Sequence, residues 1–157
     1  MTTSDDRWEI GALIARYAEL LNLGQIDALG ALFRYGSITS ENSDLRFDGI
    51  EEVTGMYRNS VVFPEKLPDT LLFTTNLQID VDGDEATSKA YFLGMHQAGG
   101  AIGPVIAGRY HDQFRRVDGQ WWFHHRHMIP DMVGDMSTHL TDSIDELASG
   151  AAAGEPN

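Results

Sequence analysis

Hydrophobic residues recur at helical spacing through the first part of the chain. The series consists of Trp8, Ile10, Leu13, Ile14, Tyr17, Leu20 and Leu21, three or four positions apart. This spacing predicts an amphipathic helix. The polar stretch from Thr2 to Ser4 supplies an N-cap, Asp5 and Asp6 are the acids of its first turn, and Gly24 ends it.

Shorter elements are expected between this helix and the middle of the chain. A second helix over Ile26 to Phe33 is followed by short extended pieces at Tyr35 to Ser40 and Leu45 to Phe47. A third helix is predicted over Ile50 to Asn59. The prolines between Phe63 and Pro68 are typical of a loop.

The second half of the chain alternates hydrophobic and polar residues, which is typical of strands. Thr70 to Val81 and Glu85 to Ala98 are predicted to form one long hairpin, and Val105 to Ile129 a second. The connecting segment, Gly99 to Pro104, is rich in glycine and is expected to be a mobile rim. After Pro130 we expect irregular chain and a short helix from Thr138 to Leu147.

Asp118-Gly119 favours a tight type I′ turn at the tip of the second hairpin. If Val117 and Gln120 flank it, Phe114 faces Phe123, Asp112 faces His125, and Tyr110 faces His127. Strict alternation then assigns one face to Gly108, Tyr110, Asp112, Phe114, Trp121, Phe123, His125 and His127. The other face holds Arg109, His111, Gln113, Arg115, Trp122, His124 and Arg126. The first face mixes aromatic rings with polar groups, which is typical of a lined pocket.

Helices followed by a meander of four antiparallel strands indicate an α+β domain. We expect a strongly curved, mostly antiparallel sheet wrapped over the N-terminal helices to form a cone with an apolar interior. Residues 1–135 are predicted to be one domain. Residues 136–157 are predicted to be a C-terminal extension, partly disordered, because its last residues are small and polar.

Composition narrows the possible partners. The chain has 24 acidic and 11 basic residues and a formal charge of −13, which opposes binding to nucleic acid or to anionic membranes. Without cysteine it has no disulfide, thiolate nucleophile or cysteine-based zinc site. The N-terminus lacks the pattern of a signal peptide, so we expect a soluble, cytoplasmic protein.

Several segments carry a resemblance to the NTF2-like superfamily, and within it to SnoaL-like proteins and ketosteroid isomerase. They are Arg16-Tyr17-Ala18, Leu21 to Gly24, Ile26 to Leu29, Leu32-Phe33, Val81 to Ala86, Gly108 to Phe114 and Asp118 to Trp121. The resemblance spans roughly residues 7–129 and implies the cone described above. Because this fold hosts many reactions, the resemblance is less specific for activity.

The resemblance suggests two patterns of catalytic residues. SnoaL-like dehydratases carry an Asp and a His where this chain has Asn22 and the segment Thr74-Thr75, so that pair is absent here. Asn22 is then expected to bind a substrate oxygen or to anchor the helix end. The ketosteroid isomerase pattern implies Tyr17 as oxyanion donor, Glu41 as general base and Asp112 as a protonated second acid.

Each of these residues also has a structural alternative. Tyr17 could be a core tyrosine bonded to a backbone carbonyl, and Glu41 lies in a sequence that suits a solvated turn. Asp112 on an apolar face needs a partner, because an isolated buried charge is costly. His125 is the expected partner, in either a structural or a catalytic pair.

The remaining candidates are expected to line the pocket. They are Asn22, Phe33, Tyr57, Phe92, Tyr110, Trp121, Phe123 and His127. His125 and His127, with His111 or His96, suggest a metal site, but there is no nearby acidic ligand pattern and the resembled families are mostly cofactor-free. We therefore predict neither a metal nor a cofactor.

We predict a cofactor-independent lyase or isomerase that acts by proton transfer on an apolar, oxygen-bearing molecule of steroid, terpenoid or polyketide type. The alternative is a non-catalytic ligand-binding or assembly subunit, similar to the small subunits of ring-hydroxylating dioxygenases. A sheet face with Trp122, His124 and Arg126 directed outward would suit pairing with a second copy. We therefore expect a homodimer.

Overall fold

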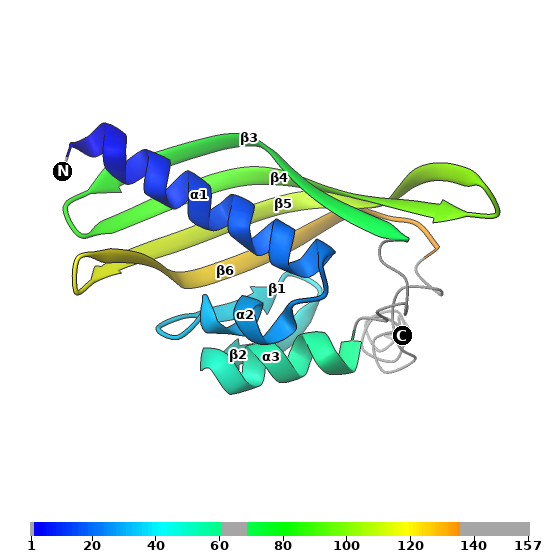
Figure 1. Cartoon of the computed structure of the whole chain (residues 1–157), viewed down its shortest axis with the longest axis horizontal. Coiled ribbons are helices and arrows are strands. Elements are labelled where there is room, and N and C mark those ends of the chain that lie inside the picture. Colours follow the sequence, from blue (N-terminus) through cyan, green and yellow to red (C-terminus); the bar gives the residue numbers. More distant parts are fainter. Residues whose placement is uncertain (1, 61–68, 136–157) are drawn as a thin grey trace, which may run out of the picture.

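A computed structural model describes residues 2–60 and 69–135 and contains three helices and six strands within those ranges. The helices are α1 (Thr3–Asn22), α2 (Ile26–Ala31) and α3 (Gly49–Ser60). The strands are β1 (Ser37–Ser40), β2 (Ser43–Asp48), β3 (Thr70–Asp82), β4 (Glu85–Ala98), β5 (Ala101–Val117) and β6 (Gln120–Val133). Figure 1 shows α1 lying along one face of the sheet, with α2 and α3 beside β1 and β2.

Helix α1 begins as the sequence predicts. Thr2 is the N-cap, and its side chain and that of Asp5 form a reciprocal capping box. Ile10, Ile14 and Tyr17 face the sheet and are almost completely buried. Trp8, which the spacing assigns to the same face, is instead 77 % exposed.

The six strands form one sheet in the order β2-β1-β6-β5-β4-β3. The antiparallel meander of β3 to β6 follows the prediction. The sheet is larger than the four strands expected, because β1 pairs in parallel with β6 and carries β2 at its outer edge. The class is α+β, with helices packed against a curved, unclosed sheet.

Irregular pairings bend the long strands. Register shifts lie between Thr75 and Gln78 on β3, between Gly94 and Met95 on β4, and at two places in the pairing of β5 with β6. An extra residue in one strand bends it and increases its twist. The sheet therefore curves around α1, and the core lies between them.

The turn between β5 and β6 forms as predicted. Asp118 and Gly119 both have positive φ, at 50° and 78°, as a type I′ turn requires. Val117 pairs with Gln120 and Phe114 with Phe123. Beyond Phe123 the predicted register is wrong, because His124 is an additional residue in the ladder.

This bulge reverses the faces of the rest of β6. Asp112 pairs with Arg126 and Tyr110 with Met128, so Arg126 points inward. His125 pairs with Gln113 and His127 with His111, on the outer face. A shift of one residue moves every later side chain to the opposite side of a sheet.

Two loop predictions are also wrong. Only Gly99 and Gly100 form the turn between β4 and β5, and Ala101 to Pro104 are already paired with β4. Strand β6 continues through Pro130 to Val133, with Pro130 next to a register shift opposite Gly108. The predicted proline loop, the helix over 138–147 and the extension 136–157 lie outside the described residues.

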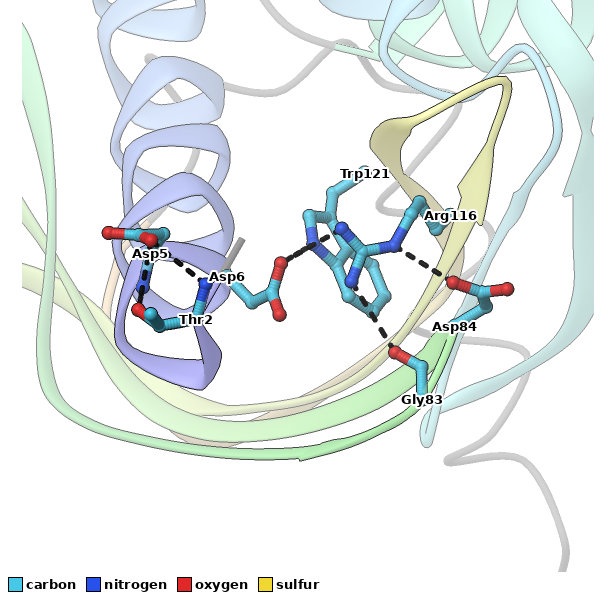
Figure 2. A network of polar contacts seen from close by, with 7 residues as sticks. All are labelled: Thr2, Asp5, Asp6, Gly83, Asp84, Arg116 and Trp121. Carbon is cyan, nitrogen blue, oxygen red and sulfur yellow. Dashed lines mark hydrogen bonds and ion pairs between the residues drawn. The ribbon is translucent and has the colours of Figure 1, made fainter.

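Both ends of α1 are fastened to the sheet by polar side chains. At its start, Asp6 accepts hydrogen bonds from the Trp121 indole at 3.1 Å and pairs with Arg116 at 2.9 Å. Arg116 also reaches Asp84 in the β3–β4 turn, as Figure 2 shows. At its end, Asn22 bonds both the N–H and the C=O of Leu72 on β3, at 2.7 and 3.0 Å.

Within residues 2–60 and 69–135, none of the helices has the length and apolar content needed to cross a bilayer.

Candidate functional site

Three tyrosines meet in the interior between α1, α3 and the sheet. The hydroxyls of Tyr17 and Tyr57 share a hydrogen bond, and the ring of Tyr110 lies 6.1 Å from that of Tyr17. Phenylalanines surround them: Phe33 stacks on Phe123 at 4.8 Å and Phe92 on Tyr110 at 4.6 Å. Because only one hydroxyl of the Tyr17–Tyr57 pair donates to the other, the second keeps a proton that it can donate elsewhere.

Arg126 lies beneath this cluster and is completely buried. Its Cζ lies 3.8 Å from the ring centre of Tyr110 and 4.1 Å from that of Tyr17. It donates two hydrogen bonds to Asp112, at 2.9 and 2.7 Å. A bidentate partner and aromatic faces together compensate for the loss of hydration of a buried guanidinium.

The electrostatics of the cluster favour donors over bases. Burial raises the pKa of Tyr57 and of Tyr110 well above the ordinary value, and the neighbouring Tyr17 adds to the effect. Burial acts to lower the pKa of Arg126, but the Asp112 carboxylate outweighs it and the pKa is raised. Tyr57, Tyr110 and Arg126 therefore keep their protons at neutral pH.

Three buried side-chain polar atoms have no hydrogen-bond partner among the described residues. They are Nη1 of Arg126, Oγ1 of Thr74 and Oγ1 of Thr54 on α3. Thr74 lies on β3 opposite Phe92, on the same side of the sheet as the tyrosines. Unbonded buried polar atoms cost about 1–3 kcal/mol each, and at a binding site a ligand can satisfy them.

Asp112 does not have the environment predicted for a protonated acid. It is buried, but Arg126 rather than His125 is its partner, with Ser88 as a weaker donor at 3.4 Å. A bidentate guanidinium stabilises the charged carboxylate. Asp112 is therefore an acceptor fixed by an ion pair.

Glu41 lies on the outer side of the sheet, away from Tyr17. Its side chain is 61 % exposed and accepts a hydrogen bond from His127 Nε2 at 2.8 Å. His125 and His127 share that outer side and contact Thr39 on β1. Neither the predicted base nor the two histidines is directed toward the tyrosines.

The other predicted lining residues divide into two groups. Phe33, Tyr57, Phe92, Tyr110 and Phe123 belong to the buried cluster around Tyr17. Asn22 and Trp121 fasten α1 to the sheet. Of the two roles predicted for Asn22, the structure shows the second, which is to anchor the end of the helix.

The sequence interpretation missed Arg126, Thr74 and Thr39. Arg126 was assigned outward because strict alternation was extended through the bulge. The regular alternation of Trp121, Trp122 and Phe123 gives no local sign of the bulge that follows at His124. Nothing local distinguishes Thr74 or Thr39 from an ordinary strand threonine.

Two adjoining hollows lie on the sheet's outer side, with volumes of about 530 and 340 Å³. Both are lined by Asp80, Thr87 and Gln113, and the smaller one also by His111, His125 and His127. No group of three or more potential metal ligands occurs within residues 2–60 and 69–135.

The interior contains hydrogen-bond donors that are surrounded by aromatic side chains. Such donors can hold an oxygen atom of an apolar ligand and stabilise negative charge that develops on it. Both buried carboxylates of the described chain, Asp6 and Asp112, are paired with arginines. The described interior therefore provides no uncommitted carboxylate for proton abstraction.

Comparison with known proteins identifies relatives of this arrangement. The family model described as a SnoaL-like domain matches residues 2–127. No curated protein matches the chain.

Solved structures share the fold at low sequence identity. An NTF2-like protein with a cystatin-like fold from Novosphingobium aromaticivorans is 21 % identical, with a TM-score of 0.68, covering 81 % of this chain and 82 % of its own. A "putative scytalone dehydratase" from the same organism is 22 % identical, with a TM-score of 0.66 and coverage of 83 % and 87 %. The beta subunit of a "putative aromatic-ring-hydroxylating dioxygenase", also from that organism, is 18 % identical, with a TM-score of 0.66 and coverage of 83 % and 92 %.

Proposed function

We propose that the interior of this chain, which belongs to the SnoaL-like domain family, binds an apolar, oxygen-bearing small molecule. The oxygen of this ligand accepts hydrogen bonds from the tyrosine hydroxyls and from Arg126. Steroids, terpenoids and polyketides have the required combination of an apolar body and few oxygen atoms. Of the functions open to the fold, binding without turnover has the stronger support from the described side chains.

The observation that carries this proposal is the gathering of donors around Tyr17. Two phenols share one hydrogen bond, and the guanidinium of Arg126 has an unbonded nitrogen beside them. A buried donor gains about 1–3 kcal/mol when it acquires an acceptor, so a ligand oxygen is favoured there. The surrounding phenylalanine rings match the ligand's apolar part.

Turnover receives less support because the described part of the interior holds no carboxylate free to act as a base. Asp112 is held by Arg126 and Glu41 is on the outer side, so neither resembles an isomerase base. The dehydratase positions hold Asn22 and Thr74, which do not accept protons at neutral pH. The protein named as a scytalone dehydratase shares the fold alone at 22 % identity.

A ligand panel tests the binding proposal. We expect apolar ketones to bind at least about tenfold more tightly than hydrocarbons of the same skeleton, since tenfold corresponds to about 1.4 kcal/mol. Tyr57→Phe should reduce this preference, because it removes one of the paired hydroxyls. Isothermal titration calorimetry gives the affinities, and Tyr91→Phe, at a tyrosine that is 50 % exposed, is the matched control. Equal binding of ketone and hydrocarbon would contradict the proposal.

The second candidate is a lyase or isomerase, and the protonated phenols favour it as hydrogen-bond donors to an oxyanion. Burial raises the pKa of Tyr57, so its hydroxyl keeps the proton that it donates to a developing negative charge. The best ketone ligand is incubated with the protein in heavy water, and mass spectrometry measures exchange next to the carbonyl and loss of water. Reaction above the buffer rate that Tyr57→Phe abolishes would replace the binding proposal with the catalytic one.

A homodimer remains part of the proposal. Phe73 and Tyr91 on the outer side of β3 and β4 are 48 % and 50 % exposed, and Leu71 beside them is 38 % exposed. Exposed apolar side chains grouped in this way favour association with another copy. The sequence predicts a dimer face that includes Trp122, His124 and Arg126, but Arg126 is buried and cannot belong to it. A monomeric mass in light scattering would contradict the dimer.

A further inference from the structure

A continuous chain of hydrogen bonds runs along β1 and β6 on the outer side of the sheet. Ser37 Oγ bonds His125 Nδ1 at 2.7 Å, and Thr39 Oγ1 bonds His125 Nε2 at 3.0 Å. Thr39 Oγ1 also bonds His127 Nδ1 at 2.8 Å, and His127 Nε2 bonds Glu41 at 2.8 Å. The parallel pairing of β1 with β6 sets Ser37 beside His125 and Thr39 beside His127.

The chemistry of these groups fixes the direction of the hydrogen bonds. A carboxylate only accepts, so His127 Nε2 carries the proton toward Glu41 and Nδ1 is the acceptor in the neutral ring. Thr39 therefore donates its single hydroxyl proton to His127 Nδ1 and accepts from His125 Nε2. His125 then accepts from Ser37 at Nδ1.

The state of His125 agrees with this assignment. Burial lowers the pKa of His125, and the nearby cation Arg46 lowers it further. His125 is therefore neutral at neutral pH, as a ring with one donor and one acceptor nitrogen must be.

This arrangement has the parts of a nucleophile with its base. A hydroxyl directed at an imidazole nitrogen, whose other nitrogen is oriented by a carboxylate, is the geometry that activates serine and threonine nucleophiles. Here Thr39 supplies the hydroxyl, His127 the imidazole and Glu41 the carboxylate, and both contacts are at hydrogen-bond distance.

A cation lies on the other side of Thr39. Arg46 on β2 is the direct cross-strand partner of Thr39, so both side chains project from the same face. Its Nε is bonded to both carboxylate oxygens of Asp48, and its terminal N–H groups are the donors that would stabilise the negative charge formed on a carbonyl oxygen when Thr39 attacks.

We propose that Thr39, His127 and Glu41 form a hydrolytic site that cleaves small esters, separate from the interior site. Thr39 Oγ1 attacks the ester carbonyl carbon while its proton passes to His127 Nδ1. The bond to the alcohol oxygen breaks, and the alcohol leaves with that proton. Water then attacks the acyl-threonine, His127 takes a proton from the water, and Thr39 recovers its hydroxyl as the acid leaves.

The adjoining hollow defines the class of ester. Its volume is about 340 Å³, and Lys89, His111, Gln113, His125 and His127 are among the residues that line it. Side chains of this kind favour short, polar acyl groups over the apolar ligands proposed for the interior.

Hydrolysis of 4-nitrophenyl acetate by the full chain tests this site. We expect a burst of 4-nitrophenolate and transient addition of one acetyl group, which peptide mass mapping assigns to Thr39. Thr39→Val should lower the rate by about 10²-fold or more, as loss of a nucleophile does. His127→Gln should have a similar effect, and Thr39→Ser should retain activity because it keeps the hydroxyl.

The matched control is Thr75→Val, at an exposed threonine on β3 that does not line this hollow. It should leave the rate unchanged. Thermal melts of each variant verify folding. The proposal is overturned if Thr39→Val keeps the burst, if the acetyl group maps only to Lys89 or to histidine, or if the wild type is no faster than free imidazole.

Discussion

At the residue scale, Arg126 organises the interior. It is a cation with no exposed surface that contacts three aromatic rings and one carboxylate. A buried ion pair gains little over apolar residues of similar size, but loss of one partner leaves the other as an uncompensated charge. The pair with Asp112 therefore makes the fold sensitive to single substitutions at either position.

We predict that Arg126→Met destabilises the protein by about 3–5 kcal/mol, because the Asp112 carboxylate then remains buried without its partner. Urea unfolding followed by circular dichroism measures the change. Arg115→Met is the control, since its pair with Glu85 is exposed and such pairs contribute about 0–1 kcal/mol. The double variant Arg126→Met with Asp112→Leu should recover much of the loss. A small effect of Arg126→Met alone would contradict this account.

At the element scale, α1 is held against the sheet by a polar contact at each end. Asp6 with Arg116 and Trp121 holds its first turn, and Asn22 holds its last. The hydrophobic face between them supplies the burial, and the polar contacts fix the position of the helix along the strands. These contacts therefore keep Tyr17 next to Tyr57 and Tyr110.

Asn22→Ala should destabilise the protein by about 1–3 kcal/mol, since both the N–H and the C=O of Leu72 lose their side-chain partner. Differential scanning calorimetry or urea unfolding detects a change of this size. Gln25→Ala, three positions later, is the control because Gln25 makes no side-chain capping bond. If both substitutions have the same small effect, Asn22 is not an anchor.

At the scale of the whole molecule, paired and buried groups limit the pH range of stability. Hydrogen bonds from Arg116 and Trp121 lower the pKa of Asp6, and the hydrogen bond from Arg109 lowers that of Asp131. Their contribution is present above the ordinary value of 3.8 and is lost as pH falls below it. Burial raises the pKa of Tyr57 and Tyr110, so their contribution is lost as pH rises beyond the ordinary value of 10.0.

We therefore expect the free energy of unfolding to be lost at both extremes, below about pH 4 and above about pH 10. Urea unfolding across the pH range measures the profile. In Tyr57→Phe the alkaline loss should begin later or be smaller, because one buried phenol no longer has to ionise. Tyr35→Phe is the control, at a tyrosine that is 44 % exposed. An identical alkaline limb in Tyr57→Phe and the wild type would contradict the assignment.

Patterns between near neighbours along the chain are sufficient to predict the helices, strands and turns of this protein and the aromatic character of its interior. The helical spacing of α1, the capping residues Thr2 and Asp5, and the type I′ turn at Asp118-Gly119 depend on neighbours a few positions away. The gathering of Tyr17, Phe33, Tyr110 and Phe123 in one core follows from the same periodicities. Such local patterns are sufficient to predict the α+β class.

Which polar groups meet depends on contacts between strands that are far apart in the sequence. One additional residue at His124 sends Arg126 inward to Asp112 and directs His125 and His127 outward. The parallel pairing of β1 with β6 then brings Ser37, Thr39 and Glu41 to those histidines. The physical reason is that a bulge costs little locally and is selected by packing across strands distant in sequence, which no periodicity along one strand records.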